Sequence, residues 1–175
     1  MENPPRHDGI AAGTLYNDTA RKLVLTFKHG RKIALAPMLA GMMASRLQML
    51  GDDWLTVPVP LHRFRLWQRG FNQSALLARQ ISDKTGTELL VDGLLRTKST
   101  PALGGLGKKQ RAKTLQGAIA VNPKHKERIK QANILLVDDV LTSGATSNAC
   151  VFVLKRAGAA KVKIACFSRV LDEAI

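Results

Sequence analysis

Residues 134–146 constrain this chain more than any other segment, because an apolar run, two acids and a small turn follow one another without a break. The run 134–137 (Ile-Leu-Leu-Val) does not alternate with polar residues, which is typical of a strand buried on both faces of a parallel sheet. Asp138 and Asp139 follow at its carboxyl end, the edge where parallel sheets bind their ligands. The sequence therefore predicts a ligand site at this edge.

The turn after the two acids has the composition of a phosphate site; it consists of Thr142, Ser143, Gly144, Ala145 and Thr146. Gly144 can adopt backbone conformations that residues with a Cβ avoid, so that consecutive N–H groups can point into one concavity. Residues 145–157 have apolar residues at helical spacing, and Gly158 is placed as a C-cap. The N-terminus of that helix would favour a phosphate. The alternative is an ordinary strand, turn and helix with an acidic cap.

This segment resembles the phosphoribosyl-pyrophosphate (PRPP) signature of type I phosphoribosyltransferases, in which an apolar run, two acids and two spacers precede Thr-Ser/Thr-Gly-x-Thr. The resemblance implies that Asp138 and Asp139 are the catalytic pair, holding the ribose 2′- and 3′-hydroxyls directly or around Mg²⁺. It also implies that residues 142–146 bind the 5′-phosphate. Carboxylates suit sugar hydroxyls and Mg²⁺ but repel phosphate, so backbone donors must bind the phosphate.

A glycine-rich stretch, Gly104-Gly105-Leu106-Gly107-Lys108-Lys109, is only superficially similar to a P-loop. Ala102 stands where the first glycine is required, and Lys109 stands where a P-loop has Ser or Thr for Mg²⁺. We expect a flexible basic loop here instead. The basic residues of this loop are Lys108, Lys109 and Arg111, and Arg69 from an earlier loop is grouped with them.

Two further segments are similar to proteins of the ComF/GntX type. Residues 57–73 contain Val-Pro-Val-Pro, a basic stretch and Arg-Gly-Phe-Asn-Gln, and residues 25–30 read Leu-Thr-Phe-Lys-His-Gly. The matches extend from Tyr16 to Val170. The paired Cys-x-x-Cys motifs of the zinc ribbon that begins many ComF-type proteins do not occur in this sequence. We expect the two cysteines, Cys150 and Cys166, to be buried apolar residues.

The resemblance also locates a pyrophosphate site, because type I phosphoribosyltransferases bind pyrophosphate in the loop after the first core strand. The residues implied are Pro58, Val59, Pro60, Leu61, His62 and Arg63. Two X-Pro bonds stiffen this loop, and either can be cis. Residues 55–81 contain no acid, so Arg65 and Arg69 would help to stabilise departing pyrophosphate, unless they form only a solvated basic face. We expect Trp67 and Phe71 to pack inside rather than to stack on bases.

Alternating strand and helix patterns predict an α/β fold: one three-layer αβα domain over residues 1–175 with a mostly parallel sheet, as in type I phosphoribosyltransferases. We expect residues 1–15 to be a loose segment and residues 94–96 and 117–121 to form a hairpin-like excursion. The other predicted strands are 55–59, 89–90, 134–137 and 162–167, and the predicted helices are 19–27, 33–50, 72–85 and 145–157. With few cysteines and no apolar run of roughly 18 residues, the chain is expected to be cytoplasmic.

The charge is strongly basic, with 27 Lys and Arg against 13 Asp and Glu, a formal net charge of +14. Such a charge would attract PRPP and exceeds what one small ligand needs. Single-stranded nucleic acid is therefore a second candidate partner, although only 5% of residues are aromatic. A third interpretation is that the charge serves solubility alone.

These observations lead to two functional hypotheses. The first is a ComF-type, Mg²⁺-dependent phosphoribosyltransferase that binds PRPP, releases pyrophosphate and transfers the phosphoribosyl group to an unidentified nitrogen acceptor. The second, which the ComF resemblance implies, is a non-catalytic protein of the same fold that binds single-stranded DNA and assists competence or DNA uptake. Neither the acceptor nor the oligomeric state follows from the sequence.

Overall fold

The computed structural model describes residues 6–29, 32–47, 50–51, 53–100 and 107–171. The strands are β1 (Ile10–Leu15), β2 (Trp54–Pro58), β3 (Glu88–Leu89), β4 (Leu94–Arg96), β5 (Ile119–Val121), β6 (Asn133–Leu141) and β7 (Lys161–Arg169). The α-helices are α1 (Asp18–His29), α2 (Ala36–Ala44), α3 (Arg63–Arg69), α4 (Gln73–Thr85), α5 (Lys108–Leu115), α6 (Lys126–Ile129) and α7 (Ala145–Arg156). Short 3-10 helices are η1 (Ile33–Leu35) and η2 (Pro123–His125). No helix in these ranges is long and apolar enough to cross a bilayer.

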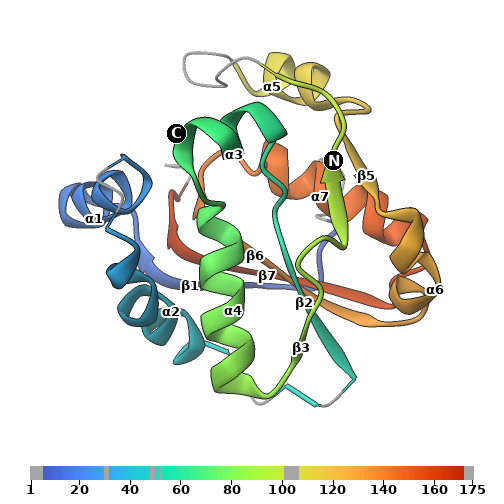
Figure 1. Ribbon diagram of the computed structural model, residues 1–175, viewed down its shortest axis with the longest axis horizontal. Helices are drawn as coiled ribbons and strands as arrows, with labels where there is room; N and C mark the ends of the chain where they lie inside the picture. The colour runs from blue at the N-terminus through green and yellow to red at the C-terminus, as the bar shows by residue number, and fades with distance from the viewer. Residues whose placement is uncertain (1–5, 30–31, 48–49, 52, 101–106, 172–175) are drawn as a thin grey trace.

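Five parallel strands form the central sheet in the order β1-β7-β6-β2-β3 (Figure 1). Strand β6 lies at its centre, and Val137 pairs with Pro58 of β2 on one side and with Ala165 of β7 on the other. All four residues of the apolar run 134–137 are fully buried. This arrangement confirms the predicted parallel sheet and the predicted two-sided burial of its central strand.

Apolar side chains cover both faces of the sheet. Leu135 and Val137 face one cluster, which includes residues of α1, α2 and α4, whereas Ile134 and Leu136 face another, with residues of α7 and β5. Alternation along the strand thus supplies both interfaces from one uninterrupted run. The three-layer αβα prediction is confirmed.

The residues that follow β3 leave the sheet and form a separate pair of strands. β4 and β5 are antiparallel, with Arg96 paired with Ile119, which confirms the predicted hairpin-like excursion. Along the chain, helix α5 lies between β4 and β5, so residues 108–115 form a helix where we expected a flexible basic loop. The Gly107 N–H donates to the Gln110 side chain at the start of α5. Residues 104–106 of the glycine-rich stretch lie outside the described part of the chain.

Two other helices differ from prediction. The basic loop expected after β2 contains α3, which begins at the His62 cap and ends at Gly70, whose φ of 83° lies in the left-handed region. The long helix expected over residues 33–50 is instead η1 followed by α2, and α2 ends as Arg46 and Leu47 donate to carbonyls three residues earlier. Leu39 and Met43 are buried, so α2 packs an apolar face on the core although it is shorter than the predicted helix.

The N-terminal segment is not loose throughout, contrary to our expectation for residues 1–15. Residues 10–15 are strand β1 and pair with β7 at the edge of the sheet. Asp8 connects this segment to β7 and α7. Its carboxylate accepts a hydrogen bond from the Val162 N–H at 2.7 Å and forms an ion pair with Lys155 at 2.7 Å. The sequence pattern Ala-Ala-Gly is weak for a strand, so pairing and packing determine the structure here.

Replacing Gly13 tests how closely β1 packs. A Cβ at this position would lie 3.0 Å from the Phe167 carbonyl oxygen and 3.3 Å from the Met42 carbonyl carbon. We therefore expect Gly13→Ala to lower the free energy of unfolding by about 1–3 kcal/mol. The control is Gly41→Ala in α2, where a Cβ has open space and alanine should stabilise by about 0.5–1 kcal/mol. Chemical denaturation measures both, and an unchanged Gly13→Ala protein would mean that β1 is not packed on α2.

Candidate functional site

The two carboxylates lie on β6 just beyond its last pairing with β2. That pairing ends at Val137, whose carbonyl accepts from the Val59 N–H at 2.9 Å, whereas pairing with β7 continues through Asp138 to Leu141. β6 is thus longer than the predicted strand 134–137 and contains both acids. Because β2 turns away at this point, the predicted pyrophosphate loop begins beside the acidic pair.

Contacts from the neighbouring helices hold both carboxylates. Asp138 Oδ1 accepts from Ser74 Oγ of α4 at 3.0 Å and from the Asp139 N–H at 2.9 Å. Asp139 is 3% exposed; its Oδ1 accepts from the Val140 N–H, and its Oδ2 lies 2.8 Å from Lys28 Nζ of α1. The strand end is therefore tied to helices from two different parts of the chain.

The electrostatics of the pair are dominated by burial. Loss of hydration raises the pKa of Asp138 to about 7, the negative charge of Asp139 raises this pKa further, and Lys28 opposes both effects. Asp138 therefore ionises only near neutral pH, and a bound cation would favour its ionised form.

The turn after β6 begins α7 at Gly144. Gly144 has a φ of 71°, in the left-handed region, and its carbonyl accepts from the Asn148 N–H at 2.7 Å in the first turn of α7. No side chain caps this helix and no acid lies in its first turn. Thr142 is exposed and residues 143–146 are half-buried. The helix start thus offers a positive dipole end, which is suited to a phosphate.

The residues predicted to bind pyrophosphate connect β2 to α3. Both X-Pro bonds in this loop are trans. His62 Nδ1 accepts from the Phe64 N–H at 3.3 Å, which leaves Nε2 for another partner. Asn72, the cap of α4, donates from Nδ2 to the Val59 carbonyl at 3.1 Å and so fixes the start of the loop against α4.

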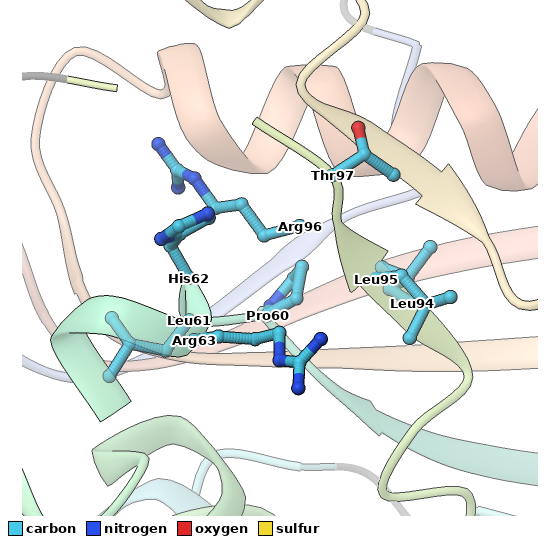
Figure 2. A pocket seen from close by; sticks show the side chains of 8 residues that line it. All are labelled: Pro60, Leu61, His62, Arg63, Leu94, Leu95, Arg96 and Thr97. Atoms are coloured by element: carbon cyan, nitrogen blue, oxygen red, sulfur yellow. The ribbon is translucent and has the colours of Figure 1, made fainter. Parts of the chain in front are cut away.

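This loop and strand β4, with Thr97 after it, line an open cavity of about 630 Å³ (Figure 2). Four of its lining residues belong to the predicted pyrophosphate loop; the lining consists of Pro60, Leu61, His62, Arg63, Leu94, Leu95, Arg96 and Thr97. In Figure 2 the side chain of Arg96 extends toward His62. Burial lowers the pKa of Arg96, and the charge of Arg65 lowers it further. Arg65 and Arg96 both donate to Thr100, to its carbonyl and its hydroxyl respectively.

Three residues at this site were not among those we predicted to bind or react. Lys28 lies in the family-like Leu-Thr-Phe-Lys-His-Gly segment but had no assigned role, whereas Ser74 and Arg96 carried no signal beyond the motifs near them. Burial lowers the pKa of Arg69, and the negative charge of the nearby Asp139 opposes this effect. Lys108, Lys109 and Arg111 are on α5, but the positions of their side chains are not described, so their part in a basic loop stays a prediction.

Magnesium fits the carboxylate pair only as an ion shared with a ligand. The described ranges contain no group of three His, Cys, Asp or Glu residues that could hold a metal ion. Asp139 Oδ2 is buried and, although close to Lys28, makes no hydrogen bond within the described chain. Mg²⁺ commonly binds through one or two carboxylates together with water and substrate oxygens, and this donor set suits such a mode.

Both cysteines are buried, as predicted: Cys150 in α7 and Cys166 in β7. Phe71 is half-buried and packs as expected, with its ring centroid 6.0 Å from that of Phe27. Trp67 does not, because 81% of its surface is exposed. The expectation that Trp67 is a packing residue is therefore wrong, since α3 has no buried residue and none of the described elements covers its outer face.

The fold and this site define the class of the protein. The family model for the phosphoribosyl transferase domain matches residues 66–174, and the chain belongs to this family. Competence protein F of Haemophilus influenzae is 33% identical over 134 residues, covering 77% of this chain and 58% of that protein. DNA utilization protein YhgH of Escherichia coli K12 is 28% identical over 98% of this chain and 76% of that protein. These relatives confirm the ComF-type resemblance.

Two solved structures are also similar. Glutamine PRPP amidotransferase from B. subtilis, complexed with ADP and GMP, has a TM-score of 0.48 at 18% identity over 74% of this chain and 25% of its own. The protein TT1426 from Thermus thermophilus has a TM-score of 0.46 at 15% identity over 80% of this chain and 85% of its own.

The raised pKa of Asp138 predicts a pH-dependent stability in metal-free buffer. An unfolded aspartate titrates near about pH 4, so between about pH 4 and 7 the folded state binds more protons and stability falls as pH rises. Asp138→Asn keeps an oxygen acceptor but cannot ionise. At pH 8 we expect this variant to be more stable than the wild type by on the order of 2 kcal/mol, and near pH 4 equally stable.

Thermal or chemical unfolding from pH 4 to 8 measures this difference. Asp83→Asn, at an exposed position of α4, serves as the control and should leave the pH dependence unchanged. Parallel curves for wild type and Asp138→Asn would contradict the raised pKa.

Proposed function

We propose that this protein binds PRPP with Mg²⁺ and transfers its phosphoribosyl group to a nitrogen acceptor, releasing pyrophosphate. One observation supports this most strongly. The pair Asp138 and Asp139 lies near the end of β6, separated only by Val140 and Leu141 from the turn that begins α7, and beside the loop that follows β2. The carboxylates can accept hydrogen bonds from ribose hydroxyls, and the turn can donate hydrogen bonds to a phosphate. The two groups are adjacent, as the hydroxyls and the phosphate are in ribose 5-phosphate.

Each part of PRPP has a complementary partner in this arrangement. The carboxylates of Asp138 and Asp139 accept hydrogen bonds from the ribose hydroxyls. The turn of residues 142–146 donates backbone N–H groups to the 5′-phosphate at the start of α7. His62, Arg63 and Arg96 line the cavity beyond the β2 loop, where the positive charge of the two arginines would receive the pyrophosphate.

The transfer breaks the bond between ribose C1 and the pyrophosphate oxygen, and the bonding electrons leave with pyrophosphate. The nitrogen lone pair of the acceptor forms the new C1–N bond, and the acceptor loses its own proton. Positive charge builds on the ribose while the old bond loosens, and the two carboxylates stabilise it from a site short of water. Arginines at the cavity stabilise the negative charge that develops on the leaving group. Bound Mg²⁺ would add further neutralisation of the pyrophosphate oxygens.

Lys28 has a positioning role in this scheme. Its ion pair with Asp139 offsets the repulsion between two adjacent carboxylates and fixes the rotamer of Asp139. Ser74 orients the carboxylate of Asp138, to which its hydroxyl donates a hydrogen bond. The two carboxylates are therefore oriented before a ligand arrives, which lowers the entropic cost of binding.

A protein that binds PRPP without transferring it fits the same geometry, and the names of the relatives refer to competence and DNA utilization rather than to a reaction. Pyrophosphate release separates the two proposals. Release that depends on an added nitrogen nucleophile supports transfer, whereas tight PRPP binding without release for any nucleobase or amine supports a binding protein.

Calorimetric titration with PRPP tests the binding site directly. We expect binding that strengthens with Mg²⁺ and that weakens at least about tenfold in the double variant Asp138→Asn, Asp139→Asn, because two charge-assisted contacts are lost. Asp83→Asn should bind as the wild type does. Equal affinity of the double variant and the wild type would remove the acidic pair from the site.

The assignment of Arg96 predicts weaker binding of inorganic pyrophosphate by Arg96→Gln. Loss of one charge-assisted contact in a partly buried site should reduce the affinity by about 10- to 100-fold. Arg156→Gln is the matched control, because Arg156 lies in the last turn of α7 beside Phe152. Unchanged pyrophosphate affinity in Arg96→Gln would show that the cavity serves another purpose.

A further inference from the structure

Helix α3 presents two aromatic rings to solvent beside the site. Trp67 is 81% exposed and Phe64 is 56% exposed, and their ring centroids are 6.4 Å apart with a 30° angle between the rings. They are three residues apart and therefore share one helical face. Leu66 adds apolar surface, at 41% exposed. No residue of α3 is buried, so the rings do not serve the core.

The same helix is positively charged, and no acidic residue near it in the sequence offsets this charge. Arg63 precedes Trp67 by one helical turn and is exposed, whereas Arg65 and Arg69 are half-buried on the side of Thr100 and Gln73, to which they donate. Residues 55–81 include no acid. α3 therefore combines an outward aromatic face with basic side chains along its edges.

The charge extends to a second element near the same end of the molecule. Helix α5 contains Lys108, Lys109, Arg111 and Lys113 and no acidic residue. Both helices lie at the top of Figure 1, and Arg65 of α3 donates to the Thr100 carbonyl in the segment that leads from β4 toward α5.

Charge complementarity limits the kind of occupant. A second copy of this chain docked α3 to α3 would bring like charges together, which is unfavourable. The occupant must instead be an extended anion that also offers flat apolar faces. A single-stranded polynucleotide has both, because its phosphates suit arginine and each base has a face that stacks on an aromatic ring.

We propose that Phe64 and Trp67 form a stacking platform for single-stranded nucleic acid, with Arg63 contacting its phosphates. Duplexes fit poorly, because their bases are already stacked on one another. The platform does not depend on transfer chemistry, and nucleic acid binding can be measured without PRPP or Mg²⁺. The low aromatic content of the chain is no obstacle, since two exposed rings in one place are sufficient to begin a platform.

Trp67 itself supplies the probe. The sequence contains two tryptophans, and Trp54 is only 7% exposed, so a base that stacks on α3 should quench mainly the fluorescence of Trp67. The full chain is titrated in EDTA with oligothymidylate and oligouridylate of about 15 nucleotides. We expect quenching, and affinity that falls with salt with a slope of about 0.7 in log units for each phosphate contact.

Three variants separate stacking from charge. Trp67→Ala should weaken binding by about tenfold or more, whereas Trp67→Phe keeps a ring and should retain most of the affinity. Phe152→Ala is the matched control, because Phe152 is also a partly exposed ring near arginines, Arg6 and Arg156, but lies on α7. It should bind as the wild type does. Because Trp67 is exposed, its loss should not unfold the protein, and circular dichroism checks this.

Several outcomes would overturn the proposal. Oligonucleotide binding without quenching, or equal affinity of Trp67→Ala and wild type, would show that charge alone is responsible. Inorganic polyphosphate that displaces the oligonucleotide at equal phosphate concentration would show the same, since it has no bases. A wild-type dimer in sedimentation that becomes a monomer in Trp67→Ala would assign the rings to self-association instead.

Discussion

The repulsion between two neighbouring carboxylates near the end of a buried strand is the constraint on which the rest of the site depends. Asp138 and Asp139 are adjacent in β6, and burial deprives them of the water that would normally screen their charges. A proton held by Asp138 near neutral pH removes part of that repulsion, and Lys28 removes another part. The fold therefore maintains an acidic pair that gains from any ligand able to supply hydroxyl protons or a cation.

This constraint also explains why distant segments converge on β6. α1 contributes Lys28, α4 contributes Ser74, and β2 ends beside Val137 where its loop begins. α1 and α4 both belong to the layer that buries Leu135 and Val137, so packing of the core sets the positions of the polar contacts. Damage to this layer should consequently disturb the site even when no site residue changes.

Much of the fold and of the acidic site could be predicted, because both depend on local patterns. The apolar run 134–137, the acids and Gly144 are contiguous, and strand burial, turn conformation and helix start each follow from nearby residues. Lys28 and Arg96 could not be placed in this way, since their contacts depend on how separate segments pack. Strand β1 was not predicted because it depends on pairing with β7. Helix α3 was not predicted because its caps, His62 and Gly70, were interpreted as loop residues.

A crystal structure of the protein with PRPP and Mg²⁺ tests the central claim most directly. The measured quantities are the distances from the ribose 2′- and 3′-oxygens to the carboxylates of Asp138 and Asp139. We predict that these distances are about 2.6–3.2 Å, or are bridged by one Mg²⁺ ion, with the 5′-phosphate at residues 142–146. PRPP bound with its ribose away from both carboxylates would contradict the account.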